Sequence, residues 1–230
     1  MKRLIAKSIL LMLPAFSAYA GSFNLNGIAG GGNFSVPITT FVERRFKTVY
    51  KQQYDFSCGS AALASLLTYH YDDVVDEQSV FVDMYNSGDQ QKIQKQGFSL
   101  LDMKLYLERH GYRADGFKID LEGLLAANAP AITIINNKGY LHFVIIKGLS
   151  EEEVLVGDPA AGIKTIPREE FEEMWGHRIL FVIHDLQNGL EARFQDEKDW
   201  ANVPKAPLGQ AVDRASLAAF NLLQPGRWDF

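Results

Sequence analysis

Hydrophobic residues in the first half of the globular part of the chain recur at helical spacing. In residues 60–71, Leu63, Leu66 and Leu67 form one apolar stripe, and the alanines around them favour a helix. Two more helices are predicted, one over 77–86 and one that begins at the capping residue Ser99 and ends near His110. The polar stretch between them, residues 88–97, is expected to form a surface loop.

Beyond residue 120 the pattern changes to short, β-branched runs. Strands are predicted over 131–135, 141–146, 153–156, 162–166 and 179–183. The turn residues 136–139 join the first two of these strands as a hairpin. Short helices are predicted over 121–127 and from Pro167 to Trp175. Helices followed by a mostly antiparallel sheet predict an α+β domain over residues 45–185.

The first twenty residues have the pattern of a secretory signal peptide. Lys2, Arg3 and Lys7 precede an apolar run, and small residues end the segment at Ala20. Cleavage there would change the formal net charge from -5 to about -8, because the segment carries three basic residues and no acidic ones. We therefore expect a soluble, exported protein. An uncleaved membrane anchor is the alternative, but the apolar run is short for a membrane span.

Two segments flank the predicted domain. Residues 21–44 are rich in glycine and polar residues and are expected to be flexible. Residues 186–230 form a C-terminal tail of mixed charge, in which 211–223 is predicted to form an amphipathic helix. The composition leaves open whether this tail docks on the domain.

Composition narrows the possible functions. Hydrophobic residues make up 47% of the chain, which is enough for a substantial core, and 28 acidic against 23 basic residues argue against nucleic-acid binding. A single cysteine excludes an intramolecular disulfide and any multi-cysteine metal site. In an exported protein, a lone thiol is either a reactive group or a small, inert core residue.

The position of Cys58 favours the reactive alternative. It directly precedes the first predicted helix, where unpaired N–H groups and the helix dipole stabilise a thiolate. Gly59 would let a substrate backbone approach the sulfur. Gln52, six residues upstream, could donate an amide N–H to an oxyanion beside the backbone N–H of Cys58.

A thiolate nucleophile needs a proton carrier, and His142 is the best placed of the five histidines. It begins the apolar strand that follows the predicted hairpin, whereas His70 lies at the far end of the Cys58 helix, about 18 Å away by helix rise. Asp158 follows the next strand and could orient the imidazole if the two strands are neighbours. Taken alone, a lone histidine is more often structural, and Asp158-Pro159 could be an ordinary turn.

These residues resemble the bacteriocin-leader, or double-glycine, cysteine peptidases, which have a papain-like fold. The matching motifs are Gln52, the segment Cys58 to Ala61, the strand that starts at His142, and Asp158-Pro159. The resemblance implies that Cys58 is the nucleophile, His142 the base and acid, Asp158 the orienting residue and Gln52 the oxyanion donor. Ser57 departs from the pattern, because the family usually has Asp before the cysteine, and this puts the fine positioning in question.

Within that family the chain resembles most the stand-alone periplasmic branch of functional-amyloid (Fap) secretion operons. The resemblance implies an exported protein or peptide as substrate and outer-membrane secretion components as possible partners. We expect no cofactor, no metal, no ATP and no nucleic acid, as the single cysteine and the acidic balance already indicate for metal clusters and nucleic acid. The chain also has no glycine-rich phosphate-binding loop with the Lys-Ser/Thr signature.

The N-terminal segment has the apolar spacing of a double-glycine leader. If Gly31 is the last residue before a cut, Gly30 precedes it, and Ile28 and Leu25 lie four and seven positions before the cut. One hypothesis is that this segment is cleaved by the protein itself or occupies its groove. The alternative is a flexible glycine-rich linker.

The sequence therefore favours a periplasmic thiol endopeptidase that cleaves an exported protein, an amyloid-fibre or secretion-system component, after a small or Gly-Gly sequence. The alternative is a peptidase-like domain that binds or escorts a secretion substrate without cleaving it. A third interpretation, a structural subunit with an incidental cysteine, requires Gln52, His142 and Asp158 to coincide by chance.

Overall fold

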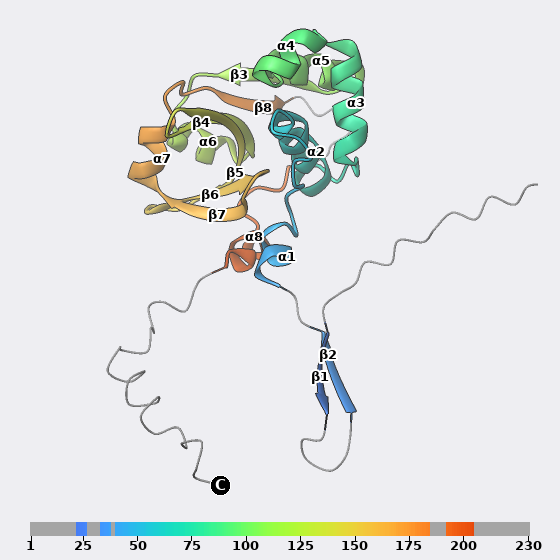
Figure 1. Ribbon diagram of the computed structural model, residues 1–230. Helices are drawn as coiled ribbons and strands as arrows, with labels where there is room; N and C mark the ends of the chain where they lie inside the picture. The colour runs from blue at the N-terminus through green and yellow to red at the C-terminus, as the bar shows by residue number, and fades with distance from the viewer. Residues whose placement is uncertain (1–21, 27–32, 38–39, 185–191, 205–230) are drawn as a thin grey trace, which may run out of the picture. The chain divides into compact units, whose positions relative to one another are not determined.

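The computed structural model describes residues 22–26, 33–37, 40–184 and 192–204 (Figure 1). The chain divides into two compact units, residues 1–40 and 41–230. In the first unit, β1 (Ser22–Asn26) and β2 (Asn33–Pro37) pair antiparallel, and Leu25 lies opposite Phe34. The sequence pattern does not predict these two strands. The predicted signal peptide, Ile28, Gly30, Gly31 and the predicted helix over 211–223 lie outside the described residues.

The helices of the second unit agree largely with the sequence pattern. They are α1 (Phe41–Arg45), α2 (Cys58–His70), α3 (Glu77–Ser87), α4 (Gln90–Gln96), α5 (Leu100–Arg109), α6 (Leu121–Ala127), α7 (Arg168–Met174) and α8 (Glu197–Asn202). Asp76, Ser99 and Asp120 cap α3, α5 and α6 with side-chain hydrogen bonds, which explains why these helices start where the pattern predicts. None of these helices within the described ranges combines the length and apolarity of a membrane span.

The prediction of a loop over 88–97 is wrong, because α4 occupies most of that stretch. Asp89 accepts a hydrogen bond from the N–H of Lys92 and starts the helix, and Gly97, with a φ of 76°, ends it. Ile93 is the one buried residue of α4. A single apolar position shows no period, so the sequence pattern could not reveal this helix.

Within the described residues of the second unit, six strands form the sheet. They are β3 (Arg113–Phe117), β4 (Ala131–Asn137), β5 (Tyr140–Leu149), β6 (Glu153–Asp158), β7 (Gly162–Pro167) and β8 (Leu180–His184). The order is β3-β8-β4-β5-β6-β7, and all of the neighbouring pairs are antiparallel. The prediction of a mostly antiparallel sheet is confirmed. The edge strand β3 was missed because its sequence, Arg-Ala-Asp-Gly-Phe, buries only Ala114.

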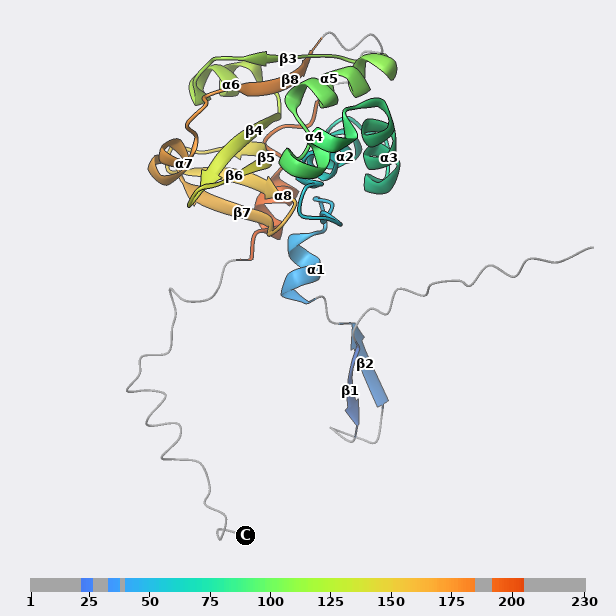
Figure 2. The same cartoon turned by 45° about the horizontal axis from the view of Figure 1, so that its top comes forward.

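The sheet is covered on both faces. Helices α2 to α5 lie against one face, and α6 and α7 lie on the other (Figures 1 and 2). Strand alternation divides the core accordingly: Phe143 and Ile145 pack with α2, whereas Val144 and Ile146 pack with α6 and α7. The second core is centred on Trp175, which is fully buried and donates its indole N–H to Thr133 Oγ1 at 2.7 Å. Burial on both faces holds β5 rigidly, and β5 carries His142.

Residues 192–204, from the predicted tail, pack on this domain. Phe194 is buried in the second core, and the side chain of Gln195 exchanges hydrogen bonds with the backbone N–H and carbonyl of Leu149 at the end of β5. The N–H of Arg193 donates to the carbonyl of His70 at the end of α2. This part of the tail therefore braces the two elements that carry Cys58 and His142.

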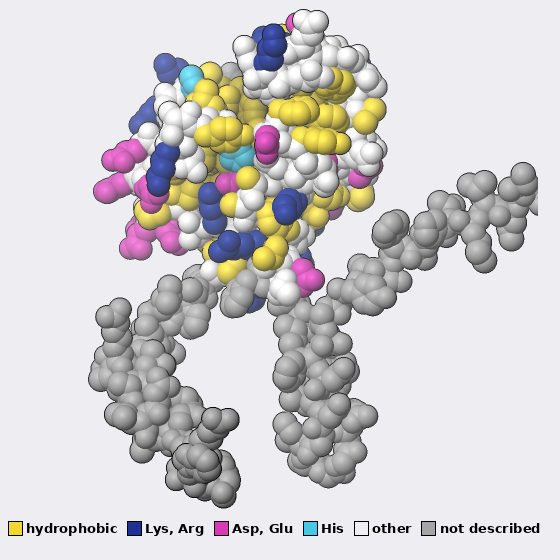
Figure 3. Space-filling model, in the orientation of Figure 1, with side chains coloured by type: hydrophobic (Ala, Val, Ile, Leu, Met, Phe, Trp, Pro, Cys, Tyr) yellow, Lys and Arg dark blue, Asp and Glu magenta, His cyan; other side chains and the backbone are white. Residues whose placement is uncertain are grey.

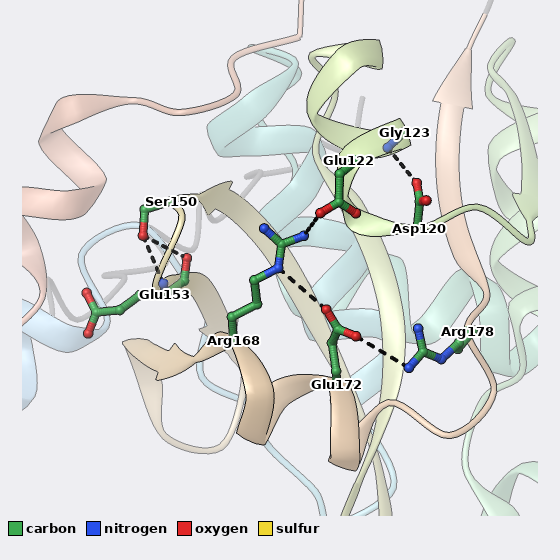
Figure 4. A network of polar contacts seen from close by, with 8 residues as sticks. All are labelled: Asp120, Glu122, Gly123, Ser150, Glu153, Arg168, Glu172 and Arg178. Carbon is green, nitrogen blue, oxygen red and sulfur yellow. Dashed lines mark hydrogen bonds and ion pairs between the residues drawn. The ribbon is translucent and has the colours of Figure 1, made fainter.

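Acidic side chains gather around α7, at the end of the domain where α6 and α7 lie (Figure 3). Arg168 lies within this group and pairs with Glu122 of α6 and with Glu172 one turn along α7 (Figure 4). Arg178 binds the other oxygen of Glu172 at 3.4 Å. The two arginines offset part of the acidic charge and join α6, α7 and the segment before β8.

Candidate active site

Cys58 is the first residue of α2, and the turn before it is held by Ser57. The Ser57 side chain is fully buried, and its Oγ accepts hydrogen bonds from the N–H groups of Gln53 and Tyr54 at 3.1 and 3.0 Å. It provides no side-chain cap for α2, so it does not occupy the N–H groups of the first turn. The Ser57 hydroxyl group thus does what the carboxylate of an Asp at this position could do. It accepts hydrogen bonds from two backbone N–H groups and fixes the turn.

A buried carboxyl group supports the same turn from α3. Glu77 is 6% exposed, and its Oε1 accepts a hydrogen bond from Ser60 Oγ at 3.1 Å. Burial raises the pKa of Glu77, while hydrogen bonds from Ser60 and Ser57 partly oppose that shift. Sequence reasoning missed Glu77, because an acidic residue in the first turn of a helix is ordinarily explained by the helix dipole.

Gly59 is required by packing. A Cβ atom at this position would lie 2.9 Å from Phe98 Cβ and 3.0 Å from Met103 Cε, both of which are core side chains. This packing explains the absence of a side chain at position 59, and the role of Gly59 toward a substrate stays a prediction. The residue allows α2 to approach α5 closely, which places the head of α2 against the sheet.

His142 and Asp158 are brought together by the pairing of β5 with β6. Ile145 lies opposite Gly157, so Asp158 lies diagonally across from His142. His142 Nε2 is 2.7 Å from Asp158 Oδ1, and the two residues are 5% and 4% exposed. The structure thus joins the two residues as the strand-neighbour argument predicts.

Asp158 is surrounded by donors. Its Oδ1 also accepts hydrogen bonds from the N–H groups of Ala160 and Ala161, and its Oδ2 lies 2.8 Å from Lys164 Nζ. Burial raises the pKa of Asp158, but the hydrogen bonds and positive charges of His142 and Lys164 outweigh this effect and lower the pKa below its usual range. Asp158 is therefore a carboxylate that holds the imidazole in one orientation.

The charge state of His142 depends on its two neighbours. Burial lowers the pKa of His142, but the hydrogen bond to Asp158 and the interaction with the Cys58 side chain raise it, with a net value of about 9. The second ring nitrogen, Nδ1, is buried and makes no hydrogen bond among the described residues, and Cys58 lines the same groove as the ring. This is the arrangement of a nucleophile, a proton carrier and an orienting carboxylate.

Cys58 and His142 line one groove of about 580 Å³, which lies between the β4–β5 hairpin on one side and the start of α2 with residues 94–99 on the other. Its walls also contain Phe56, Gly97, Phe98, Ile134, Tyr140, Leu141 and Phe143. The Tyr140 hydroxyl donates to the carbonyl of Asp55 at 3.0 Å. The Tyr140 ring stacks on the His142 ring, with 5.9 Å between the ring centroids. Tyr140 thus joins the β5 wall to the loop before Cys58.

Gln52 connects the two halves of the site through its backbone. Its N–H donates to the carbonyl of Pro159 at 3.0 Å, which ties the loop before Cys58 to the turn after Asp158. Its side-chain Nε2 donates to the carbonyl of Tyr54 at 3.1 Å, and its Oε1 is buried without a partner among the described residues. One of the two amide N–H groups therefore remains for another acceptor.

The remaining histidines lie outside this groove. His70 is buried and binds the carbonyl of Arg193 through Nδ1, His110 and His184 form surface pairs with Asp83 and Asp115, and His177 is exposed. Within the part of the chain that the structure describes, no group of three or more His, Cys, Asp or Glu side chains is arranged to hold a metal ion. The groove with Cys58 is thus the candidate active site.

The comparisons with known proteins agree with this geometry. A model of the Peptidase C39 family matches residues 46–186. The chain is 38% identical over 184 residues to the "Probable functional amyloid protease FapD" of Pseudomonas fluorescens. The aligned residues make up 79% of this chain and 81% of the relative. A protein of the same name from Pseudomonas aeruginosa is 38% identical over 174 residues, or 76% of this chain and 77% of the relative.

Among solved structures, the fold resembles the peptidase domain of Streptococcus ComA, a bifunctional ABC transporter involved in quorum sensing. The TM-score is 0.50 at 17% sequence identity, over 60% of this chain and 98% of that domain. The predicted α+β, papain-like peptidase fold is therefore confirmed.

Proposed function

The chain belongs to the peptidase C39 family and is a cysteine peptidase, and we propose that it works in the periplasm, where it cleaves an exported protein after a small or Gly-Gly sequence. The observation that carries the proposal is that Cys58 and His142 line one groove and that Asp158 is hydrogen-bonded to His142. The complete constellation favours cleavage over the alternative of a domain that only binds or escorts its substrate.

In the proposed mechanism, His142 carries a proton and faces the Cys58 thiolate. The sulfur attacks the substrate carbonyl carbon, and His142 gives its proton to the leaving amine as the peptide bond breaks. Water then attacks the thioester, neutral His142 accepts a proton from that water, and the Cys58 thiolate leaves. Asp158 stabilises the imidazolium form and keeps the ring oriented in both steps.

The oxyanion of each tetrahedral intermediate needs donors that are already in place. The backbone N–H of Cys58 lies at the head of α2, in a first turn that no side chain caps. The free amide N–H of Gln52 is the second proposed donor, and the bonds of Gln52 to Tyr54 and Pro159 restrict its movement. Removing one such donor typically costs about 100- to 1000-fold in kcat.

The position of the Tyr140 ring supports specificity for glycine. Tyr140 lies beside His142 in the groove and is hydrogen-bonded to the loop before Cys58, and Phe56, Phe98 and Phe143 also line the groove. Glycine residues let an extended substrate pass close to both walls, whereas a branched side chain would meet the Tyr140 ring. Gly-Gly or another pair of small residues before the cut is therefore the proposed recognition element.

The substrate class is proposed from the relatives. Two of them, named functional amyloid proteases, share 38% of their aligned residues with this chain. The basic, apolar and small-residue order of residues 1–20 supports export. We propose an amyloid-fibre or secretion-system component as the substrate and a periplasmic site of action, with outer-membrane secretion components as partners.

Cell fractionation combined with N-terminal sequencing tests the location and self-processing together. The proposal expects the protein in the periplasmic fraction, with Gly21 as its first residue if only the signal peptide is removed. A first residue at Gly32 that depends on Cys58 would show cleavage after Gly31 by the protein itself. Recovery of full-length protein in the cytoplasm would contradict export, and a Gly21 start in both the wild type and Cys58→Ala would contradict self-processing.

A further inference from the structure

The two oxygens of Asp158 have different partners. Oδ1 accepts three hydrogen bonds, from His142 Nε2 and from the N–H groups of Ala160 and Ala161. Oδ2 has one partner among the described residues, the ammonium group of Lys164 at 2.8 Å. The Asp158 side chain is only 6% exposed, so without Lys164 this oxygen would lose its partner in a largely water-free environment.

Lys164 reaches Asp158 because of the pairing of β6 with β7. Asp158 lies opposite Gly162, and Lys164 comes two residues later on β7, so its side chain leaves the same face of the sheet. The Lys164 side chain is 35% exposed. The Lys164 ammonium group is thus close enough to bind Asp158, while its side chain stays in contact with water.

We propose that Lys164 is a positioning residue of the peptidase, which holds Asp158 in the rotamer that faces His142. Its ammonium group follows the Cys58 thiolate, the His142 imidazolium and the Asp158 carboxylate in a row of alternating charges. The inference rests on the roles proposed above for these three residues. Lys164 touches neither the sulfur nor the substrate groove, so its contribution passes through Asp158.

An ordinary surface ion pair would not have this effect. Lys104 and Asp115 form such a pair, in which the side chains are 35% and 45% exposed, so water can replace either partner. Lys164 has the same exposure as Lys104, but its partner is buried. The two lysines therefore offer a matched comparison between a cation bound to a buried carboxylate and one bound to a hydrated carboxylate.

Removing a positive charge next to Asp158 should change the titration of the whole line. The titratable and charged groups near His142 and Asp158 are Cys58 from α2, Tyr140 from β5, Lys164 from β7, Asp55 beyond Tyr140, and Lys95 near the end of α4, which lines the same groove. Among these groups, Lys164 is the cation in direct contact with Asp158. Its loss disfavours the Cys58 thiolate and favours the His142 imidazolium. In a plot of the Cys58 alkylation rate against pH, the change at acid pH (the acid limb) and the change at basic pH (the basic limb) should therefore both move to higher pH.

The test is the rate of Cys58 alkylation by iodoacetamide between pH 4 and 10. Cys58 is the only cysteine of the chain, so the modification reports on this site alone and needs no substrate. For Lys164→Met and Lys164→Gln we expect both limbs to shift upward, with about a threefold to tenfold lower rate on the acid limb. Lys164→Arg should restore the wild-type profile, and Lys104→Met should leave it unchanged.

Melting temperatures of the four variants show whether each is folded. A Lys164→Met profile that superimposes on the wild type, or an equal shift in Lys104→Met, would overturn the inference. A wild-type thiol that reacts with the pH dependence of free cysteine, and does so equally after His142→Ala, would instead overturn the proposed function. The two failures are therefore distinguishable.

Discussion

Lys147 of β5 and Asp199 of α8 form a buried ion pair, with 3.1 Å between Nζ and Oδ2. Their side chains are 0% and 7% exposed. Lys147 Nζ also donates to the carbonyl of Thr48, and Thr48 Oγ1 donates to the other oxygen of Asp199 at 2.7 Å. The contact therefore fastens residues 192–204 to the strand that carries His142 and to the segment that leads to Gln52.

We expect Asp199→Ala to lower the free energy of unfolding by about 3–5 kcal/mol, because it leaves the Lys147 ammonium buried without a counterion. The double variant Lys147→Met/Asp199→Leu should recover most of this loss, since neither charge remains. Urea denaturation monitored by tryptophan fluorescence measures both values. A loss below about 1 kcal/mol for Asp199→Ala would show that water reaches the pair.

His70 predicts sensitivity to acid. Burial lowers the pKa of His70 to about 3, and the positive charge of Lys147 adds to the effect. The unfolded chain therefore binds a proton below pH 6.5 that the folded protein refuses. Stability that is complete above pH 6.5 should fall by up to about 1.4 kcal/mol per pH unit as the pH drops toward 3.

The loss of stability per pH unit should be smaller in His70→Gln than in the wild type. It should be unchanged in His177→Gln, because His177 is exposed. Denaturation at pH 7, 6, 5 and 4 gives the slopes. Equal slopes in the wild type and His70→Gln would show that His70 is not the cause of the acid sensitivity.

Asp158→Asn tests the orienting role. The amide keeps the size of the carboxylate but removes the charge that holds the pKa of His142 near 9, so the basic limb of the alkylation profile should move to lower pH. Cleavage should fall by about 10- to 1000-fold, less than the loss in Cys58→Ala or His142→Ala, because part of the geometry survives. Unchanged activity and an unchanged basic limb would exclude Asp158 from the mechanism.

Tyr140→Ala should open the groove. We expect the rate of Cys58 modification by N-phenylmaleimide to rise about tenfold relative to that by iodoacetamide, because only the bulky reagent meets the ring. Tyr140→Phe, which loses the hydrogen bond to Asp55 but keeps the ring, should show a smaller change. Phe117→Ala removes an exposed aromatic side chain of β3 and serves as the control. A constant ratio in all variants would mean that Tyr140 does not limit access.

The part of the fold that has strong periodicity could be predicted from the sequence. The leucine stripe of α2, the hairpin of β4 with β5 and the Asp158-Pro159 turn each carry a local signal. The residues missed are those whose position depends on tertiary contacts. Helix α4 buries only Ile93, and β3 is a polar edge strand.

The residues of the candidate site likewise fall into those that the sequence pattern could predict and those that depend on tertiary contacts. Cys58, His142 and Asp158 each lie at the end of a predicted element, so chain order and strand pairing suffice to bring them together. Lys164 and Glu77 reach the site from neighbouring elements and show no distinctive spacing in the sequence. For Gly59, the sequence could not distinguish room for a substrate from packing against Phe98.

The most direct test of the central claim is mass spectrometry of peptides incubated with the purified protein. The set contains a peptide of residues 22–36, with Gly30 and Gly31 before the expected cut, and the same peptide with both glycines replaced by valine. We predict one cleavage after Gly31 by the wild type, none in the valine peptide, and none by Cys58→Ala or His142→Ala. Equal cleavage by Cys58→Ala, or cleavage by the wild type that ignores the glycine pair, would contradict the account.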